Sequence, residues 1–156
     1  MDHFAQYDSP IGLLVMKSDG HSLTGLSPAL SEDRSSDLPI FQEVRSWLDA
    51  YFRGKRPDPH LLPLDPQGTP FQRAVWEQLL TVPYGEAQSY GDIARAIGNP
   101  RACQAVGQAV GRNPIGIIIP CHRILGADGR LTGYAWGLDK KKWLLRHEGV
   151  NFIENP

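Results

Sequence analysis

Residues 113–123 read Asn-Pro-Ile-Gly-Ile-Ile-Ile-Pro-Cys-His-Arg, and this stretch decides the fold. The β-branched run Ile115–Ile119 is typical of a fully buried strand. A proline follows the run, so the next side chain, Cys121, is expected on a rigid turn where a nucleophile can be aimed. The stretch therefore predicts a short buried strand that ends at a candidate reactive cysteine.

The residues around Cys121 suggest how its thiol could be activated. A thiolate is the nucleophilic form, and an imidazole can take the thiol proton when a third group holds the ring in the right tautomer. His122 and Glu148 are candidates for these roles, although periodicity does not tell whether Glu148 reaches His122. A lone cysteine is also commonly a small buried hydrophobe, and a lone histidine a core or surface residue. The chemistry alone leaves a nucleophile and inert packing equally open.

The helices before and after this stretch have clear boundary signals. A capping box at residues 69–72 predicts a helix to about Thr81, whose face of Phe71, Val75, Trp76 and Leu79 is expected in the core. Ser89 opens a short helix, and a second helix is expected from about Pro100 to Gly111. These two suggest a helix-turn-helix, but many helical hairpins bind no nucleic acid. A last helix is expected over Leu138–His147.

The first part of the chain predicts a smaller lobe. The apolar runs Ile11–Met16 and Leu23–Leu26 flank a turn and predict a β-hairpin or meander, and apolar spacing over Leu38–Phe52 predicts a helix. Five prolines and glycines in residues 55–68 predict a linker without regular structure. The expected fold class is α/β (α+β). An N-terminal sheet-plus-helix lobe with its linker, residues 1–65, joins a mainly helical C-terminal lobe, residues 66–156, with the helix-turn-helix and the buried strand before Cys121.

Composition narrows the class of protein. The 156 residues are 41% hydrophobic and 21% charged, which is ordinary for a globular chain and unlike a disordered or membrane protein. No apolar stretch is long enough to cross a bilayer and the start lacks a signal segment, so a cytoplasmic location is expected. The two cysteines, Cys103 and Cys121, have no paired spacing, which gives a metal site or disulfide little support.

Charge is divided unevenly along the chain. Residues 1–87 carry a net charge of −5 and residues 88–156 carry +4, within a total of −1. A polyanionic partner would meet the second part, because lysine and arginine make the phosphate contacts. Such a division also arises by chance on a solvated surface, so it supports a nucleic-acid partner without establishing one.

Residues 119–124, Ile-Pro-Cys-His-Arg-Ile, resemble the active-site signature of the O6-alkylguanine-DNA alkyltransferases, or methylated-DNA–protein-cysteine methyltransferases. The resemblance is nearly continuous from about residue 66 to 150, while residues 1–65 resemble the family's N-terminal lobe only loosely. The further matching motifs are Thr69-Pro70-Phe71-Gln72, Pro83-Tyr84-Gly85, Ser89-Tyr90, Asn113-Pro114, Thr132-Gly133-Tyr134 and residues 143–149.

The resemblance implies direct-reversal DNA repair. The alkyl group of O6-alkylguanine in double-stranded DNA, and conceivably of O4-alkylthymine, would move once and irreversibly to Cys121, with no metal or organic cofactor. His122 would act as a base through a water molecule, and Glu148 would orient it. Tyr134 matches the tyrosine that donates to guanine N3, and Asn113 would fix the turn around the cysteine.

The resemblance also implies DNA contacts and base flipping. Ala102 matches the small residue that the recognition helix presents to the minor groove, and Tyr90 matches the tyrosine that helps to rotate the nucleotide. Arg101 and Arg112 are candidate phosphate partners. Backbone groups near Cys121 and Ala135 would hold the base edge. The protein is expected to be monomeric in solution, with clustering on DNA left open.

Two residues depart from the family pattern. Gln104 stands where most members carry an arginine that replaces the flipped base, which predicts weaker DNA affinity or a less efficient flip. Trp136 stands where several relatives have glycine, and an indole beside the pocket predicts a preference for methyl over bulky O6 substituents. The open alternatives are a module that binds alkylated DNA without transfer and a helix-turn-helix alkylation sensor.

Overall fold

The computed structural model describes residues 2–29 and 36–154, which form two compact units. One unit holds the residues up to Gln67 together with Pro114–Gly116, and the other holds Gly68–Asn113 and the residues from Ile117 onward. Each unit combines helices with strands, which confirms the predicted α+β class. The expected boundary after residue 65 lies close to this division, but Pro114–Gly116 groups with the first unit.

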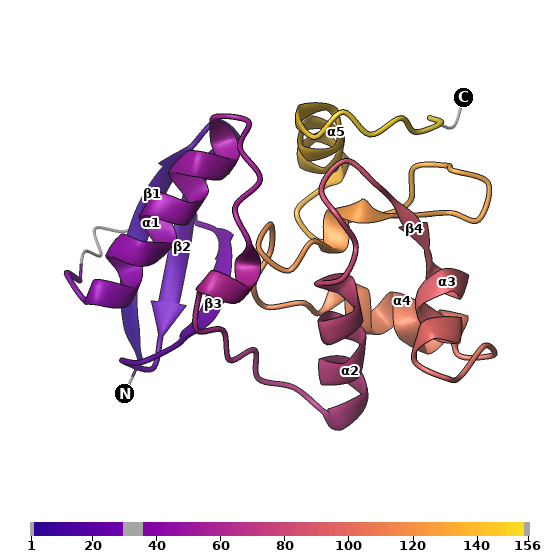
Figure 1. Ribbon diagram of the computed structural model, residues 1–156, viewed down its shortest axis with the longest axis horizontal. Helices are drawn as coiled ribbons and strands as arrows, with labels where there is room; N and C mark the ends of the chain where they lie inside the picture. Colours follow the sequence, from indigo (N-terminus) through magenta and orange to yellow (C-terminus); the bar gives the residue numbers. More distant parts are fainter. Residues whose placement is uncertain (1, 30–35, 155–156) are drawn as a thin grey trace. The chain divides into compact units, whose positions relative to one another are not determined.

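An antiparallel sheet with the strand order β1-β2-β3 forms the first unit's centre (Figure 1). Its strands are β1 (His3–Ser9), β2 (Gly12–Ser18) and β3 (Leu23–Pro28). The predicted hairpin is confirmed as β2 and β3, joined by a loop in which the Asp19 carboxylate accepts two backbone N–H groups. Strand β1 lies at an edge and fully buries only Ala5, so it lacks the apolar alternation that would have predicted it.

Helix α1 (Pro39–Phe52) covers this sheet and confirms the predicted helix. It begins with proline at its first position and ends before Gly54, whose φ of 85° is the left-handed conformation that glycine adopts readily. One face of α1 is buried: Ile40, Phe41, Val44, Trp47, Leu48 and Tyr51.

The expectation of no regular structure in residues 55–68 is wrong for one turn. A 3-10 helix, η1 (Pro59–Leu61), begins with the Asp58 carboxylate accepting the His60 N–H at 2.9 Å. Prolines forbid an α-helix here, but proline at the first position of a single turn costs no hydrogen bond. The following residues are tied to β3 through Leu23, whose N–H donates to Pro63 and whose carbonyl accepts from Asp65.

The second unit contains four α-helices within the described residues: α2 (Pro70–Leu79), α3 (Tyr90–Ala96), α4 (Cys103–Gly111) and α5 (Leu138–His147). Capping boxes at Thr69 and Ser89 open α2 and α3 as predicted. Helix α4 begins three residues later than expected, because a turn closed by the hydrogen bond from Ala102 to Asn99 precedes it. The Trp76 indole donates to the Ala109 carbonyl at 2.8 Å and ties α2 to α4.

A short parallel pair of strands links the start of α3 to the chain after Cys121. Strand β4 (Gln88–Ser89) pairs with β5 (Ile124–Leu125). Because α3 starts at the end of β4, this pairing sets the position of Tyr90 relative to the turn η2 (Cys121–Arg123).

The predicted strand at Ile115–Ile119 is wrong, although its burial is confirmed. Ile115 makes an isolated bridge to Leu26, and the next residues form turns. Ile117 has a φ of 67°, an unfavourable left-handed conformation for a β-branched residue that no strand accommodates. Prolines on both sides cannot donate ladder hydrogen bonds. The apolar run is therefore a buried loop that leads into the cysteine.

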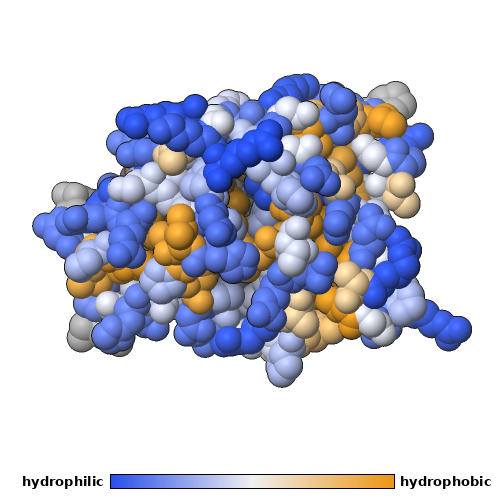
Figure 2. All heavy atoms as spheres, viewed as in Figure 1, coloured by the Kyte–Doolittle hydropathy of each residue, from blue (hydrophilic) through white to orange (hydrophobic). Residues whose placement is uncertain are grey.

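The surface drawn in Figure 2 is predominantly hydrophilic, with hydrophobic side chains gathered in several separate patches. Within residues 2–29 and 36–154, no helix has both the length and the apolar character needed to cross a membrane.

Candidate active site

The turn η2 carries the candidate nucleophile. Cys121 follows Pro120 directly, and only 6% of its surface is exposed. Two hydrogen bonds converge on the Ile119 carbonyl, one from the Cys121 N–H and one from Asn113 Nδ2, each at 2.8 Å. The Asn113 side chain therefore holds the backbone that presents the sulfur.

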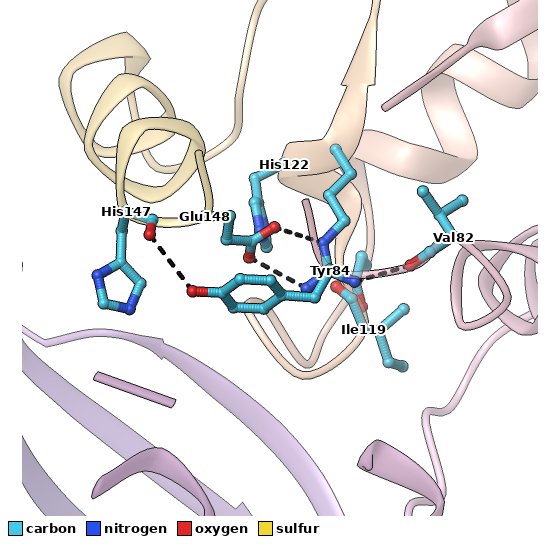
Figure 3. A network of polar contacts seen from close by, with 8 residues as sticks. Val82, Tyr84, Ile119, His122, His147 and Glu148 are labelled. Atoms are coloured by element: carbon cyan, nitrogen blue, oxygen red, sulfur yellow. Dashed lines mark hydrogen bonds and ion pairs between the residues drawn. The ribbon is translucent and has the colours of Figure 1, made fainter. Parts of the chain in front are cut away.

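A buried polar network surrounds Glu148, the residue that ends α5 (Figure 3). Its Oε2 lies 2.7 Å from His122 Nε2, and its Oε1 accepts from Arg123 Nε at 2.7 Å. Arg123 also donates from Nη2 to Oε2 at 3.0 Å and from Nη1 to the Val82 carbonyl at 2.7 Å. Glu148 thus holds the imidazole and the guanidinium at once, a contact that the sequence pattern left open.

The protonation state of His122 follows from its contacts. The ring is fully buried, and its Nδ1 has no hydrogen-bond partner within the described part of the chain. Burial lowers the pKa of His122, Glu148 opposes that change, and the positive charges of Arg123 and Lys141 add to it. A neutral ring that donates Nε2–H to Glu148 leaves Nδ1 as an acceptor. The resting histidine can therefore take one proton.

The pKa of Glu148 is lowered and the pKa of the Cys121 thiol is raised. Burial alone would raise the pKa of Glu148, but the charges and hydrogen bonds of His122 and Arg123 bring it below its ordinary value. Burial raises the pKa of the Cys121 thiol, against the effect of hydrogen bonds from Asn113 and Tyr134 and of the Lys141 charge. The resting thiol is therefore protonated, and the nearby groups stabilise the thiolate once a base removes the proton.

A cavity of about 240 Å³ lies beside Tyr134, smaller than the usual pocket for a drug-sized ligand. It is lined by Tyr90, Gly107, Val110, Gly111, Gly133, Tyr134 and Ala135. Tyr90, Tyr134 and Ala135, which the sequence analysis singled out as site residues, thus line one pocket together with residues of α4. The Trp136 ring lies 5.9 Å from the Tyr134 ring, so it packs against a residue of the pocket wall without lining the cavity itself.

The remaining predicted DNA contacts lie at the two ends of α4. Ala102 is its N-cap, with Arg101 and Gln104 exposed on either side, and the exposed Arg112 is its C-cap. These residues are away from the buried network, as contacts with an external partner require.

Lys141 is a candidate functional residue that the sequence analysis missed. It is only 1% exposed, and its ammonium donates to the Ile124 carbonyl at 2.6 Å and to Thr132 Oγ1 at 3.1 Å. It lies on the buried face of α5 with Leu144 and Leu145. A lysine among the apolar positions of a helix was the available signal, since buried lysines are rare without a structural or chemical reason.

Burial lowers the pKa of Lys141 to about 8, and the nearby Cys121 opposes this change. The ammonium is therefore still the major form at neutral pH. Within the described residues, no group of three histidine, cysteine, aspartate or glutamate side chains is arranged to hold a metal ion.

Comparison with known proteins finds one family along most of the chain. The DNA-binding domain of 6-O-methylguanine DNA methyltransferase matches residues 70–150, and the ribonuclease-like domain of the same proteins matches residues 3–66.

Two relatives named methylated-DNA–protein-cysteine methyltransferase match nearly the whole chain. The one from Haemophilus influenzae is 44% identical over 97% of this chain and 89% of its own length. The one from Mycobacterium leprae is 47% identical over 95% and 93%. The crystal structure of Mycobacterium tuberculosis OGT in complex with DNA is 45% identical, with a TM-score of 0.84, over 94% of this chain and 92% of that one.

Proposed function

This chain belongs to the 6-O-methylguanine DNA methyltransferase family, and from that membership we propose that it repairs double-stranded DNA by moving the alkyl group of O6-alkylguanine onto Cys121. Methyl is the main group proposed, with O4-alkylthymine as a second substrate. The observation that carries the proposal is a buried thiol followed in sequence by a buried histidine whose Nδ1 is unpartnered, together with Tyr134, which affects the pKa of the thiol and lines a cavity.

The proposed transfer begins with the thiol proton, which passes to His122 Nδ1 through a water molecule. The thiolate then forms a bond to the alkyl carbon while the bond from that carbon to O6 breaks. The electron pair of the broken bond goes to the purine, which takes up a proton and leaves as guanine. A thioether has no easy route back to a thiol, so each molecule acts once and no cofactor takes part.

Glu148 supports the step in which His122 becomes charged. Its carboxylate stays ionised because its pKa is lowered, so it can stabilise the imidazolium through the 2.7 Å contact. Lys141 and the side chains of Asn113 and Tyr134 favour the thiolate at the same moment.

The resemblance gives Tyr134 a second role, as donor to guanine N3. Tyr134 lies close enough to Cys121 to oppose the rise in the thiol pKa that burial causes, and it also lines the cavity. Tyr90 lines the same cavity. Tyr134 is therefore the proposed donor to N3, and Tyr90 is the tyrosine proposed to help rotate the nucleotide.

The helix pair α3 and α4 is the proposed DNA-reading element, with the start of α4 entering the minor groove and Arg101 and Arg112 meeting phosphates. The lesion is proposed to reach the sulfur by rotation out of the stack, which costs a few kcal/mol and costs least for a poorly paired base. The protein is proposed to act as a monomer.

Incubation with duplex DNA containing O6-methylguanine, followed by mass spectrometry and peptide mapping, tests the proposal. We expect a stable gain of one methyl group on Cys121. Tight binding without a mass gain would instead indicate a lesion-binding module or an alkylation sensor.

Gln104, which stands where most members of the family carry an arginine, offers a gain-of-function prediction. Gln104→Arg should raise duplex affinity and the single-turnover rate about threefold, because a cation that stacks on exposed bases contributes roughly 0.5–1 kcal/mol. Gln108→Arg is the matched control, since Gln108 is exposed one turn further along α4. An equal gain in both variants would assign the effect to net charge instead of base replacement.

Trp136 offers a specificity prediction. Trp136→Gly should raise the rate of transfer from O6-benzylguanine relative to O6-methylguanine about tenfold, because removing the indole releases the Tyr134 ring packed against it. Rates for both substrates on the same variant serve as the internal control. An unchanged ratio would show that the indole does not limit the size of the alkyl group.

A further inference from the structure

The turn between α2 and β4 lies against the buried Arg123 side chain (Figure 3). It contains the motif Pro83-Tyr84-Gly85, and the carbonyl of Val82 accepts from Arg123 Nη1 at 2.7 Å. The Arg123 Cζ atom lies 5.7 Å from the centroid of the Tyr84 ring, within the range of a cation–π contact. The Tyr84 hydroxyl donates to the His147 carbonyl at 3.3 Å. The turn therefore contacts the guanidinium twice and is tied to the end of α5.

Arg123 fixes the orientation of the Glu148 carboxylate. Its Nε donates to Oε1 at 2.7 Å and its Nη2 donates to Oε2 at 3.0 Å. Two parallel hydrogen bonds from a planar guanidinium hold a carboxylate in one plane, which a lysine ammonium cannot do. Oε2 also contacts His122 Nε2 at 2.7 Å. The carboxylate oxygen that faces the imidazole is therefore placed by the arginine.

The three side chains also balance their charges. His122, Arg123 and Glu148 are all buried, so a net charge among them would be removed from water at a high cost in free energy. The negative carboxylate and the positive guanidinium cancel, and the cluster is neutral when the imidazole is neutral. Without the guanidinium, the carboxylate would be uncompensated until His122 took up a proton from solvent.

This balance matters for the proposed proton transfer. When the Cys121 proton passes to His122, a thiolate and an imidazolium appear together, and the total charge of the site does not change. An imidazole that Glu148 alone had already protonated would have no lone pair for the thiol proton. The arginine is therefore needed before the transfer, to keep the base empty.

Other charged groups act on the same imidazole. Burial is the largest cause of the lowered pKa of His122, Glu148 opposes it, and Arg123 adds to it more than Lys141 does. Arg123 has the larger effect because it shares the carboxylate with the ring. The titratable and charged groups around the ring are Cys121 and Arg123 on η2, Lys141 and Glu148 on α5, and Tyr84 on the turn after α2.

We propose that Arg123 is a positioning residue, which orients the Glu148 carboxylate and balances its charge so that His122 rests neutral until the thiol gives up its proton. The turn at residues 82–85 holds the guanidinium in this place. The inference deepens the proposed function and rests on it.

Imidazole chemical shifts in the DNA-free protein measure the resting charge of His122 directly. The His122 signal is one of five and is identified by its loss in His122→Gln. In the wild type, His122 should titrate below its ordinary midpoint of about pH 6.5. Arg123→Met, which removes the charge and keeps an unbranched side chain, should raise this midpoint by about one pH unit or more. Arg123→Lys keeps the charge and should titrate close to the wild type.

The single-turnover rate of methyl transfer, measured on saturating duplex DNA with O6-methylguanine, should depend on pH in the same way. Arg123→Met should be about 3- to 10-fold slower than the wild type at pH 6 and should approach the wild-type rate at pH 8.5, where the imidazole has lost its proton. Arg130→Met is the matched control, because Arg130 is exposed and pairs with Asp128 on the surface. This control should shift neither the rate nor the midpoint.

Tyr84→Leu provides a second variant in case Arg123→Met does not fold. It keeps every charge and removes the ring beside the guanidinium, so the midpoint should rise by less than in Arg123→Met. An unchanged midpoint in both variants would overturn the inference, as would equal shifts in Arg123→Met and Arg123→Lys. A wild-type midpoint at or above about pH 6.5 would overturn it without any variant. A wild type that gains no methyl group would instead overturn the proposed function, because the titration requires no transfer.

Discussion

Cys121→Ser should bind duplex DNA that contains O6-methylguanine and gain no mass, with transfer slowed by at least about 10³-fold. The serine hydroxyl is far harder to deprotonate than a thiol and is the weaker nucleophile toward an sp³ carbon. The Asn113 hydrogen bond to the Ile119 carbonyl does not involve the sulfur, so the turn should keep its shape. Single-turnover mass spectrometry at matched occupancy, set by a binding titration, measures the effect.

Cys103→Ser is the control for this variant. Cys103 is exposed and makes only a weak contact with the Pro100 carbonyl, so its loss should leave the gain of mass on Cys121 intact. If Cys121→Ser protein still acquired a methyl group, and the group mapped to Cys103, the assignment of the nucleophile would be wrong.

Glu148→Gln should lower the free energy of unfolding by about 3–5 kcal/mol at pH 7, the usual cost of leaving a buried charge without its partner. The Arg123 guanidinium would lose a carboxylate that it contacts at 2.7 and 3.0 Å, inside the protein. Transfer at pH 7 should also slow, because the imidazolium of His122 loses its counter-charge. Urea unfolding at constant m-value measures the first effect, and single-turnover kinetics the second.

Glu154→Gln is the matched control, because Glu154 pairs with Arg146 and Lys142 on the surface. Exposed ion pairs contribute only about 0–1 kcal/mol, so this variant should be close to the wild type. A similar loss in both variants would show that the buried network has no special contribution.

The stability difference between the wild type and Glu148→Gln should depend on pH in a direction that the pKa of Glu148 determines. The pKa of Glu148 is lower in the folded protein than its ordinary value, so its contribution is complete above about pH 4.3 and declines as the pH falls through the folded pKa. The stability gap between the wild type and Glu148→Gln should therefore narrow only below about pH 4.3. A gap that closed between pH 5 and 8 would point to the histidine instead.

The starts of α2 and α3 were predictable because short-range chemistry determines them. The capping boxes at Thr69 and Ser89 involve side chains three residues apart, and both occur as expected. The run Ile115–Ile119 was not predictable, because its pattern reports burial and the φ of Ile117 does not follow from residue type. A buried loop and a buried strand have the same apolar composition.

The site was predictable only in part for a related reason. Cys121 and His122 are adjacent in sequence, but the contact between His122 and Glu148 joins residues 26 positions apart and depends on the fold. Lys141 was missed because its significance lies in what surrounds it. A lysine in a helix ordinarily indicates a solvated surface, and only its burial shows otherwise.

The loop before Cys121 bears on how the protein can be re-engineered. The Leu26 N–H in β3 donates to the Pro114 carbonyl at 2.9 Å, and the Leu26 carbonyl accepts from the Gly116 N–H at 3.2 Å. Residues 114–116, between α4 and the cysteine, therefore belong with the N-terminal sheet. The C-terminal part consequently cannot be transplanted alone, even though every residue of the site lies in it. A chimera that contains only the C-terminal part must therefore provide, from its other parent, a strand that makes the hydrogen bonds of Leu26. Without them, the loop that positions the Cys121 sulfur loses its support.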